Sequence, residues 1–260
     1  MALDNLRPRP CVRRRMNLYY LIDCSGSMNY NGCIESVNGT MPEIVEILRD
    51  VSLANNDHGD IYMSCITFSD SAQVCTPQPV SALSYSWTPV KAHGLTNMAD
   101  ALDKLDAQLT ADLAAAGNRR FLRPAVIILS DGDPDPGWEE ALERLEQNPM
   151  FRSAYKIAIA IGASPANVAM KRALTRFASD GTPGSVPNII SVTDLTRLTD
   201  VIRMVSGTVS RIGSRTTGAG GTPEGPDPVA AAVHAALQGG VEPMDGVKIP
   251  SIGPDSDFWD

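Results

Sequence analysis

The sequence predicts an α/β fold: a doubly wound, mostly parallel central sheet with helices on both faces. Apolar runs of strand length alternate along the chain with amphipathic helical stripes, which is the pattern of βαβ units. Several runs are apolar at every position, as in strands buried on both faces of a parallel sheet. At 260 residues, with 43% hydrophobic and 20% charged residues, the chain is long and apolar enough to bury a sizeable core.

Each expected strand is an apolar run, and each expected helix carries apolar residues three or four positions apart. The first run ends at Asp23, and Gly117-Asn118 should stop the second helix. Strands are expected at residues 17–22, 61–68, 73–76, 125–129, 156–161 and 188–192. Helices are expected at residues 34–51, 98–113, from 138 onward, at 170–177 and at 195–209. The domain should therefore span residues 16–210, after a basic Pro/Arg arm (1–15) and before a flexible extension (211–260) formed by a Gly/Pro/Ala-rich linker and an acidic tail.

Composition excludes several function classes. The formal net charge of −8 argues against nucleic acid as a partner, because an acidic surface repels phosphates. No apolar run approaches the ~20 residues of a membrane span, so no membrane partner is expected. No apolar segment typical of a secretion signal follows the first basic residues, and no CxxC occurs. We therefore expect reduced thiols and a cytoplasmic location. The five cysteines are Cys11, Cys24, Cys33, Cys65 and Cys75.

Oxygen-bearing side chains follow two of the expected strands and precede one helix. Asp23, Ser25 and Ser27 lie on the turn that leaves the first strand, and Asp131 follows the strand at 125–129. Thr96 lies in a Gly-Leu-Thr loop before the helix at 98. Ligands of open α/β sheets bind beyond the carboxyl ends of the strands. Carboxylates and hydroxyls are hard ligands, so the cation expected here is Mg²⁺, with Mn²⁺ equally compatible, whereas zinc is disfavoured because the three histidines are not paired at ligand spacing.

Two carboxylates in one site need a counter-charge. At about 4 Å, two such groups repel by ~4 kcal/mol at an effective dielectric of about 20. A divalent cation between Asp23 and Asp131 would remove this repulsion. The metal centre, with its two carboxylates, would then be close to neutral. Such a cation would still attract a carboxylate from outside the chain.

These motifs together resemble the metal-ion-dependent adhesion site of von Willebrand factor type A domains. The resemblance rests on Asp-x-Ser-x-Ser at Asp23–Ser27, the threonine Thr96 and the Asp-Gly pair at Asp131. It implies that Asp23, Ser25, Ser27 and Thr96 bind the metal, with Asp131 bound directly or through water. It also implies that a partner's Asp or Glu takes the vacant coordination position. The stretch Tyr20–Met28 is most similar to the bacterial cytosolic tellurium-resistance type, which implies a stress-response or phage-defence setting with phosphorylation partners.

Other classes of function remain alternatives at this stage. A metal-dependent hydrolase would use Ser25 or Ser27 as nucleophile, although neither lies in GxSxG, and an extracellular adhesion protein is a second alternative. No GxGxxG or GxxxxGK[ST] phosphate loop occurs. The run from Asp131 to Leu142 is not an EF-hand, because Leu142 replaces the required Glu. Asp133 is expected to cap the helix that starts near Trp138, or to support the metal ligands.

The acidic end of the chain provides a further hypothesis. Asp255, Asp257 and Asp260 lie beside two aromatic residues after a flexible linker. These carboxylates could occupy the metal site in cis or on a neighbouring copy. The alternative is a solubilising tail or an independent docking peptide. The expected function is thus Mg²⁺-dependent protein–protein recognition, without catalysis.

Overall fold

A computed structural model describes residues 14–54, 59–115, 122–161, 168–179, 188–192, 203 and 205–210. The expected basic arm, apart from its last two residues, lies outside the described residues. The expected linker and acidic tail, with Asp255, Asp257 and Asp260, also lie outside them.

The described residues form the predicted α/β fold around one mostly parallel sheet. Six of its seven strands follow the order β3-β2-β1-β5-β6-β7, and the seventh, β4, also pairs with β2. Strands β2, β1, β5, β6 and β7 run parallel, whereas β3 and β4 are antiparallel to β2. The strands are β1 (Arg14–Asp23), β2 (Gly59–Phe68), β3 (Ala72–Val74), β4 (Val80–Ser81), β5 (Ala125–Ser130), β6 (Tyr155–Ile161) and β7 (Ile189–Val192).

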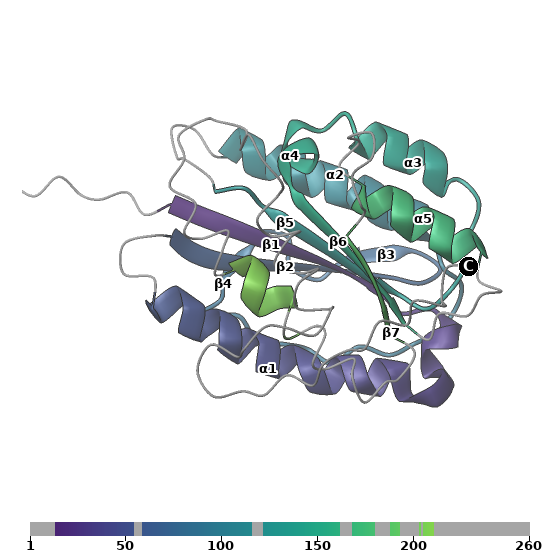
Figure 1. Cartoon of the computed structure of the whole chain (residues 1–260), viewed down its shortest axis with the longest axis horizontal. Coiled ribbons are helices and arrows are strands. Elements are labelled where there is room, and N and C mark those ends of the chain that lie inside the picture. The colour runs from purple at the N-terminus through teal and green to yellow at the C-terminus, as the bar shows by residue number, and fades with distance from the viewer. Residues whose placement is uncertain are drawn as a thin grey trace, which may run out of the picture.

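Helices cover both faces of the sheet (Figure 1). Helix α1 (Cys33–Ala54) lies on one face, after the 3-10 segment η1 (Gly26–Gly32), and α2, α3, α4 and α5 lie on the other. Residues 203 and 205–210 are also helical and lie on the α1 side (Figure 1). The opposite layer consists of α2 (Met98–Ala115), α3 (Trp138–Leu145), α4 (Pro149–Ser153) and α5 (Val168–Ala178). No helix within the described ranges is long and apolar enough to span a bilayer.

Strand β1 is buried on both faces, as its continuous apolar run predicts. Leu18, Tyr20 and Ile22 pack into the core layer under α1, whereas Tyr19 and Leu21 pack into the layer under α2, α3 and α5. Alternate side chains of a strand point to opposite faces, so this central strand contributes to both layers. The arrangement fixes the carboxyl end of β1, where Asp23 lies, between β2 and β5.

The structure extends several expected elements and adds short ones. Strand β1 begins at Arg14, so Arg14 and Arg15 belong to the sheet rather than to the expected arm. Segments η1, β4 and α4 were not expected from the sequence. The helix expected at 195–209 is described only at residue 203 and from residue 205 onward, where the chain is helical.

Candidate metal centre

Asp23 lies at the end of β1 with no exposed surface. The Ser25 backbone N–H donates to its Oδ1 at 2.8 Å, and the Ser130 hydroxyl donates to its Oδ2 at 2.6 Å. Ser25 has extended backbone angles, φ −65° and ψ 165°, before the chain turns into η1. Both carboxylate oxygens are therefore held in place by neighbouring groups.

A chain of hydroxyls connects this turn to β5. The Oγ atoms of Ser25 and Ser27 lie 2.9 Å apart, and the Ser27 hydroxyl donates to Asp131 Oδ1 at 2.7 Å. Asp131 comes directly after β5, the parallel neighbour of β1. The two carboxylates predicted to share a site thus lie at the same edge of the sheet.

Backbone hydrogen bonds hold the Thr96 loop against both of these segments. The Gly26 N–H donates to the Gly94 carbonyl at 2.9 Å, and the Asp135 N–H donates to the Thr96 carbonyl at 3.0 Å. Gly94 has φ +72°, and a Cβ there would lie 2.4 Å from an Asp70 carboxylate oxygen. Asp70 Oδ1 in turn accepts the Leu95 N–H at 3.0 Å. The left-handed backbone at position 94 thus favours glycine, and a larger residue there would also push the Asp70 side chain away.

Gly132 reveals how the hydroxyls converge. A Cβ built on Gly132 would lie 3.2 Å from Ser27 Oγ, 3.3 Å from Thr96 Oγ1 and 4.0 Å from Ser25 Oγ. Three hydroxyls from two loops therefore lie close together around Gly132, which has no side chain to separate them. Three hydroxyls beside two carboxylates form a donor set that fits a small hard cation.

Burial disfavours the charged forms of both carboxylates when no cation is present. Burial raises the pKa of Asp23 to about 6, and the hydrogen bonds from Ser130 and Ser25 only partly oppose it. Burial likewise raises the pKa of Asp131, against the hydrogen bond from Ser27. A bound cation would favour the ionised form of both groups.

The structure brings together all five side chains that the sequence singled out: Asp23, Ser25, Ser27, Thr96 and Asp131. Nowhere in the described part of the chain do three His, Cys, Asp or Glu side chains cluster closely enough to hold a metal. Any metal bound here would therefore depend on the hydroxyls. Of the histidines, His58 and His234 lie outside the described residues, and His93 is an exposed neighbour of Asp70.

The expectation that Asp133 caps the helix starting near Trp138 is wrong. That helix, α3, has Gly137 at its N-cap, without a side-chain hydrogen bond. Asp133 Oδ1 instead accepts the Met170 backbone N–H at 2.7 Å, in the first turn of α5. The helix that Asp133 caps is distant in sequence and was therefore not visible from local spacing.

Sequence reasoning gave no role to two residues of the site, Ser130 and Asp70. Ser130 is the last residue of β5, next to Asp23 across the strand pair, and its hydroxyl bonds to the Asp23 carboxylate. Asp70 holds the loop that carries Thr96. A hydroxyl at the end of the neighbouring strand was the available signal for Ser130.

Comparison with known proteins identifies the fold family. The family model described as von Willebrand factor type A domain matches residues 17–203. No curated protein matches the chain.

Solved structures share the fold at low sequence identity. A von Willebrand factor type A protein from Catenulispora acidiphila is 17% identical, with a TM-score of 0.53 over 76% of this chain and 43% of that one. The pilus adhesin SpaC from Lactobacillus rhamnosus GG is 12% identical, with a TM-score of 0.58 over 77% of this chain and 31% of that one. Proximal thread matrix protein 1 from the mussel byssus, with a zinc-occupied MIDAS motif, is 18% identical, with a TM-score of 0.51 over 77% and 46%.

This chain spans less than half the length of each of these three structures. At such identities the likeness concerns the fold alone. The family match, in contrast, covers residues 17–203 and includes all five candidate ligands. On that match, the chain belongs to the von Willebrand factor type A domain family.

Proposed function

We propose that this protein is a metal-dependent recognition module that binds an acidic residue of a protein partner. Asp23, Ser25, Ser27, Thr96 and Asp131 would hold the cation, with Asp131 bound directly or through water. Mg²⁺ is the expected ion and Mn²⁺ the alternative, because both prefer oxygen ligands. The observation that carries the proposal is the clustering of the Ser25, Ser27 and Thr96 hydroxyls around Gly132, beside two carboxylates.

The ligand set explains why a partner's carboxylate would be attracted. The bound cation would bring two positive charges to the edge of a buried site, and the two carboxylates would leave the metal centre close to neutral. A centre without net negative charge can still attract a carboxylate from a partner. Asp23 and Asp131 would set that charge, while Ser25, Ser27 and Thr96 contribute neutral oxygens. The zinc reported in the mussel protein's motif supports divalent metal binding within this fold.

Recognition rather than catalysis is favoured by the contacts of the two serines. Ser25 and Ser27 hydroxyls bond to each other, and Ser27 bonds to Asp131. Within the described ranges, no histidine is hydrogen-bonded to either hydroxyl, so neither serine forms the Ser–His pair typical of a nucleophilic serine.

For the biological setting, we propose a bacterial cytoplasmic stress response of the tellurite-resistance or phage-defence type, with phosphosignalling partners. The similarity of Tyr20–Met28 to that group supports this setting. The four described cysteines are all free thiols, which agrees with a reducing compartment. The carboxylates of the acidic tail would compete for the same metal position, in cis or from a neighbouring copy.

The first test is metal binding itself. Titration calorimetry of the full chain with Mg²⁺ should give saturable binding, which Asp23→Ala abolishes. Asp50→Asn is the matched control, because it removes one carboxylate from the exposed surface of α1. Equal Mg²⁺ affinity in Asp23→Ala and wild type would overturn the assignment of the ligands.

The second test is partner binding. Affinity capture with wild type and Asp23→Ala, each in Mg²⁺ and in EDTA, should recover a partner only with wild type in Mg²⁺. Replacing the acidic residues of a recovered partner one at a time should identify the residue that reaches the metal. Capture that persists in EDTA would contradict the mechanism.

A further inference from the structure

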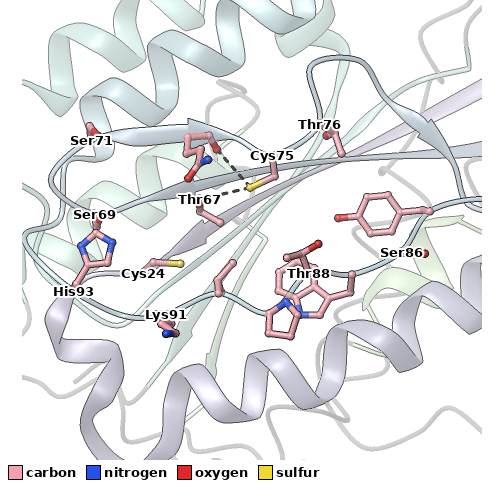
Figure 2. A pocket seen from close by; sticks show the side chains of 15 residues that line it. Cys24, Thr67, Ser69, Ser71, Cys75, Thr76, Ser86, Thr88, Lys91 and His93 are labelled. Atoms are coloured by element: carbon pink, nitrogen blue, oxygen red, sulfur yellow. Dashed lines mark hydrogen bonds between the residues drawn. The ribbon is translucent and has the colours of Figure 1, made fainter.

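A pocket of about 570 Å³ opens beside the candidate metal centre. Strands β2 and β3 form one wall, and the segment 85–93 forms the other (Figure 2). Asn38 of α1 fixes this second wall, because its side chain donates to the Val90 carbonyl at 2.8 Å and accepts the Val90 N–H at 2.9 Å. The volume is typical of a small-molecule site.

Two cysteines lie opposite each other across the β2–β3 pair. The antiparallel register pairs Ile66 with Val74, so Cys65 and Cys75 are the next opposed pair along the strands. The Cys75 N–H donates to the Cys65 carbonyl at 2.9 Å. Directly opposed residues of antiparallel strands have Cα atoms about 4.5–5.5 Å apart, which lies within the range that a disulfide spans.

Cys75 faces the pocket and Cys65 lies beneath it. Cys75 is exposed and lines the pocket, whereas Cys65 is buried in the core under α1. Figure 2 shows the Cys75 sulfur with its contacts to Thr67 Oγ1 and to the Gln73 carbonyl, both at 3.7 Å. A small molecule can thus reach Cys75 first and Cys65 only afterwards.

The environment of Cys75 favours its thiolate form. A hydrogen bond from the Cys65 thiol lowers the pKa of Cys75 to about 6, although burial opposes the shift. The same hydrogen bond, together with burial, raises the pKa of Cys65 well above its ordinary value. At neutral pH the exposed sulfur is therefore the nucleophile and the buried one remains a thiol.

We propose that this pocket is a site of thiol–disulfide exchange with a low-molecular-weight disulfide, in which Cys75 reacts first and Cys65 resolves the product. The Cys75 thiolate attacks one sulfur of the small disulfide RSSR, forming a mixed disulfide and releasing RS⁻. Cys65 then loses its proton to solvent or to RS⁻ and attacks Cys75 Sγ. This second step forms the Cys65–Cys75 disulfide and releases a second RS⁻, so that one RSSR is reduced as two protein thiols are oxidised.

The first step itself prepares the second. Once Cys75 is in the mixed disulfide, it no longer carries the negative charge that accepts a hydrogen bond from the Cys65 thiol. The main cause of the raised pKa of Cys65 therefore disappears, and its thiolate becomes more accessible. The pocket also carries Lys91 and His93 at one end and several hydroxyls, which suit a polar disulfide bearing carboxylates.

The test uses oxidised glutathione on the full chain in a Cys11→Ser background, because Cys11 lies outside the described residues. Intact mass and peptide mapping after treatment should show the loss of two hydrogens and a Cys65–Cys75 disulfide. Cys65→Ser should instead keep one glutathione on Cys75, and Cys75→Ser should remain fully reduced. Cys33→Ser is the matched control, a buried thiol outside the pocket, and should behave as the unsubstituted background does.

Several outcomes would overturn the proposal. Oxidation of Cys75→Ser at the background rate would show that another thiol reacts. A persistent adduct on Cys75 when Cys65 is present would eliminate the resolving step, and a disulfide to Cys24 would assign that step to another residue. Peptide mapping of the Cys11→Ser protein decides these last two points even if a further variant fails to fold. The whole experiment runs in EDTA, so its result is independent of the proposed metal function.

Discussion

Asp23 illustrates how a single buried carboxylate links folding to metal binding. Its pKa is raised to about 6, mainly by burial, because the side chain has no exposed surface. An unfolded aspartate has its ordinary pKa, so the metal-free folded protein binds this proton more tightly than the unfolded chain does. The resulting destabilisation is fully present above about pH 6 and is relieved as the pH falls through that value.

The first prediction is that the metal-free protein becomes more stable as the pH is lowered. Between about pH 7.5 and about pH 5, thermal unfolding in EDTA should shift to higher temperature. Asp23 alone should raise the free energy of unfolding by ~1.4 kcal/mol, because pH 5 lies about one unit below its folded pKa and each unit corresponds to ~1.4 kcal/mol. The raised pKa of Asp131 acts in the same direction. Mg²⁺ should stabilise the protein most at the higher pH. Asp23→Asn should flatten the dependence in EDTA, and an unchanged slope would show that other groups cause it.

Gly132 offers a way to crowd the candidate site without removing any ligand. An alanine Cβ would lie 3.2 Å from Ser27 Oγ and 3.3 Å from Thr96 Oγ1, which is tighter than van der Waals contact and would displace these two hydroxyls. The second prediction is that Gly132→Ala lowers Mg²⁺ affinity at least tenfold, about 1.4 kcal/mol, as measured by calorimetry. Gly39→Ala is its control, because nothing lies within 4 Å of that Cβ. In the middle of α1, that control should gain ~0.5–1 kcal/mol of stability and keep its affinity.

At the scale of elements, the two aspartates that follow β5, Asp131 and Asp133, have different roles. Asp131 faces the hydroxyl cluster, whereas Asp133, two residues later, accepts the Met170 N–H at the start of α5. The third prediction is that Asp133→Ala lowers the free energy of unfolding by ~1 kcal/mol, the ordinary cost of a lost helix cap. Mg²⁺ affinity should be retained, unlike in Asp131→Ala. A loss of affinity in Asp133→Ala would place that carboxylate among the groups that support the metal.

The helices and strands that could be predicted are those whose own residues show a pattern of burial. A continuous apolar run or a helical stripe reports burial directly, which is why β1, β5 and α1 were predictable. The two-residue strand β4 exists only through its pairing with β2, which no local pattern encodes. The short helix α4 has Asn148 as its N-cap, whose side chain accepts the Met150 N–H, and Pro149 as its first residue. The Asn-Pro pair is typical of the start of a helix. The apolar stretch after it is too short to predict a helix by itself.

The sequence predicted the candidate ligands of the site, but not the residues that hydrogen-bond to these ligands or hold their loops. Asp23 and Asp131 follow recognisable strands, and strands of this kind end at a common edge of the sheet. The contact between Ser130 and Asp23 depends on strand register, which pairs Ile22 with Leu129. Register between distant parallel strands is set by the packing of the whole sheet, so the sequence alone could not assign it.

At the scale of the whole molecule, β1 joins the candidate metal centre to a buried polar network at its other end. The Asn17 side chain donates to Tyr19 Oη at 2.9 Å, and Tyr19 donates to Asp112 Oδ2 of α2 at 2.6 Å. Arg15 extends the network, donating to Asn17 Oδ1 at 2.6 Å. These bonds fasten α2, the helix that follows the Thr96 loop, to the central strand.

The last prediction separates the stability of this network from the chemistry of the site. In Tyr19→Phe, Asn17 Nδ2 loses its acceptor and Asp112 Oδ2 loses its donor, which should cost ~1–3 kcal/mol in denaturant unfolding. Tyr19 lies four residues before Asp23, ~13 Å along a strand, so Mg²⁺ affinity should not change. The stability losses of Tyr19→Phe and Asp133→Ala should then add within ~0.5 kcal/mol, as for independent sites. Weaker Mg²⁺ binding in Tyr19→Phe would instead show that β1 and α2 transmit strain from the network to the metal ligands, and that the site depends on the whole sheet rather than on its edge.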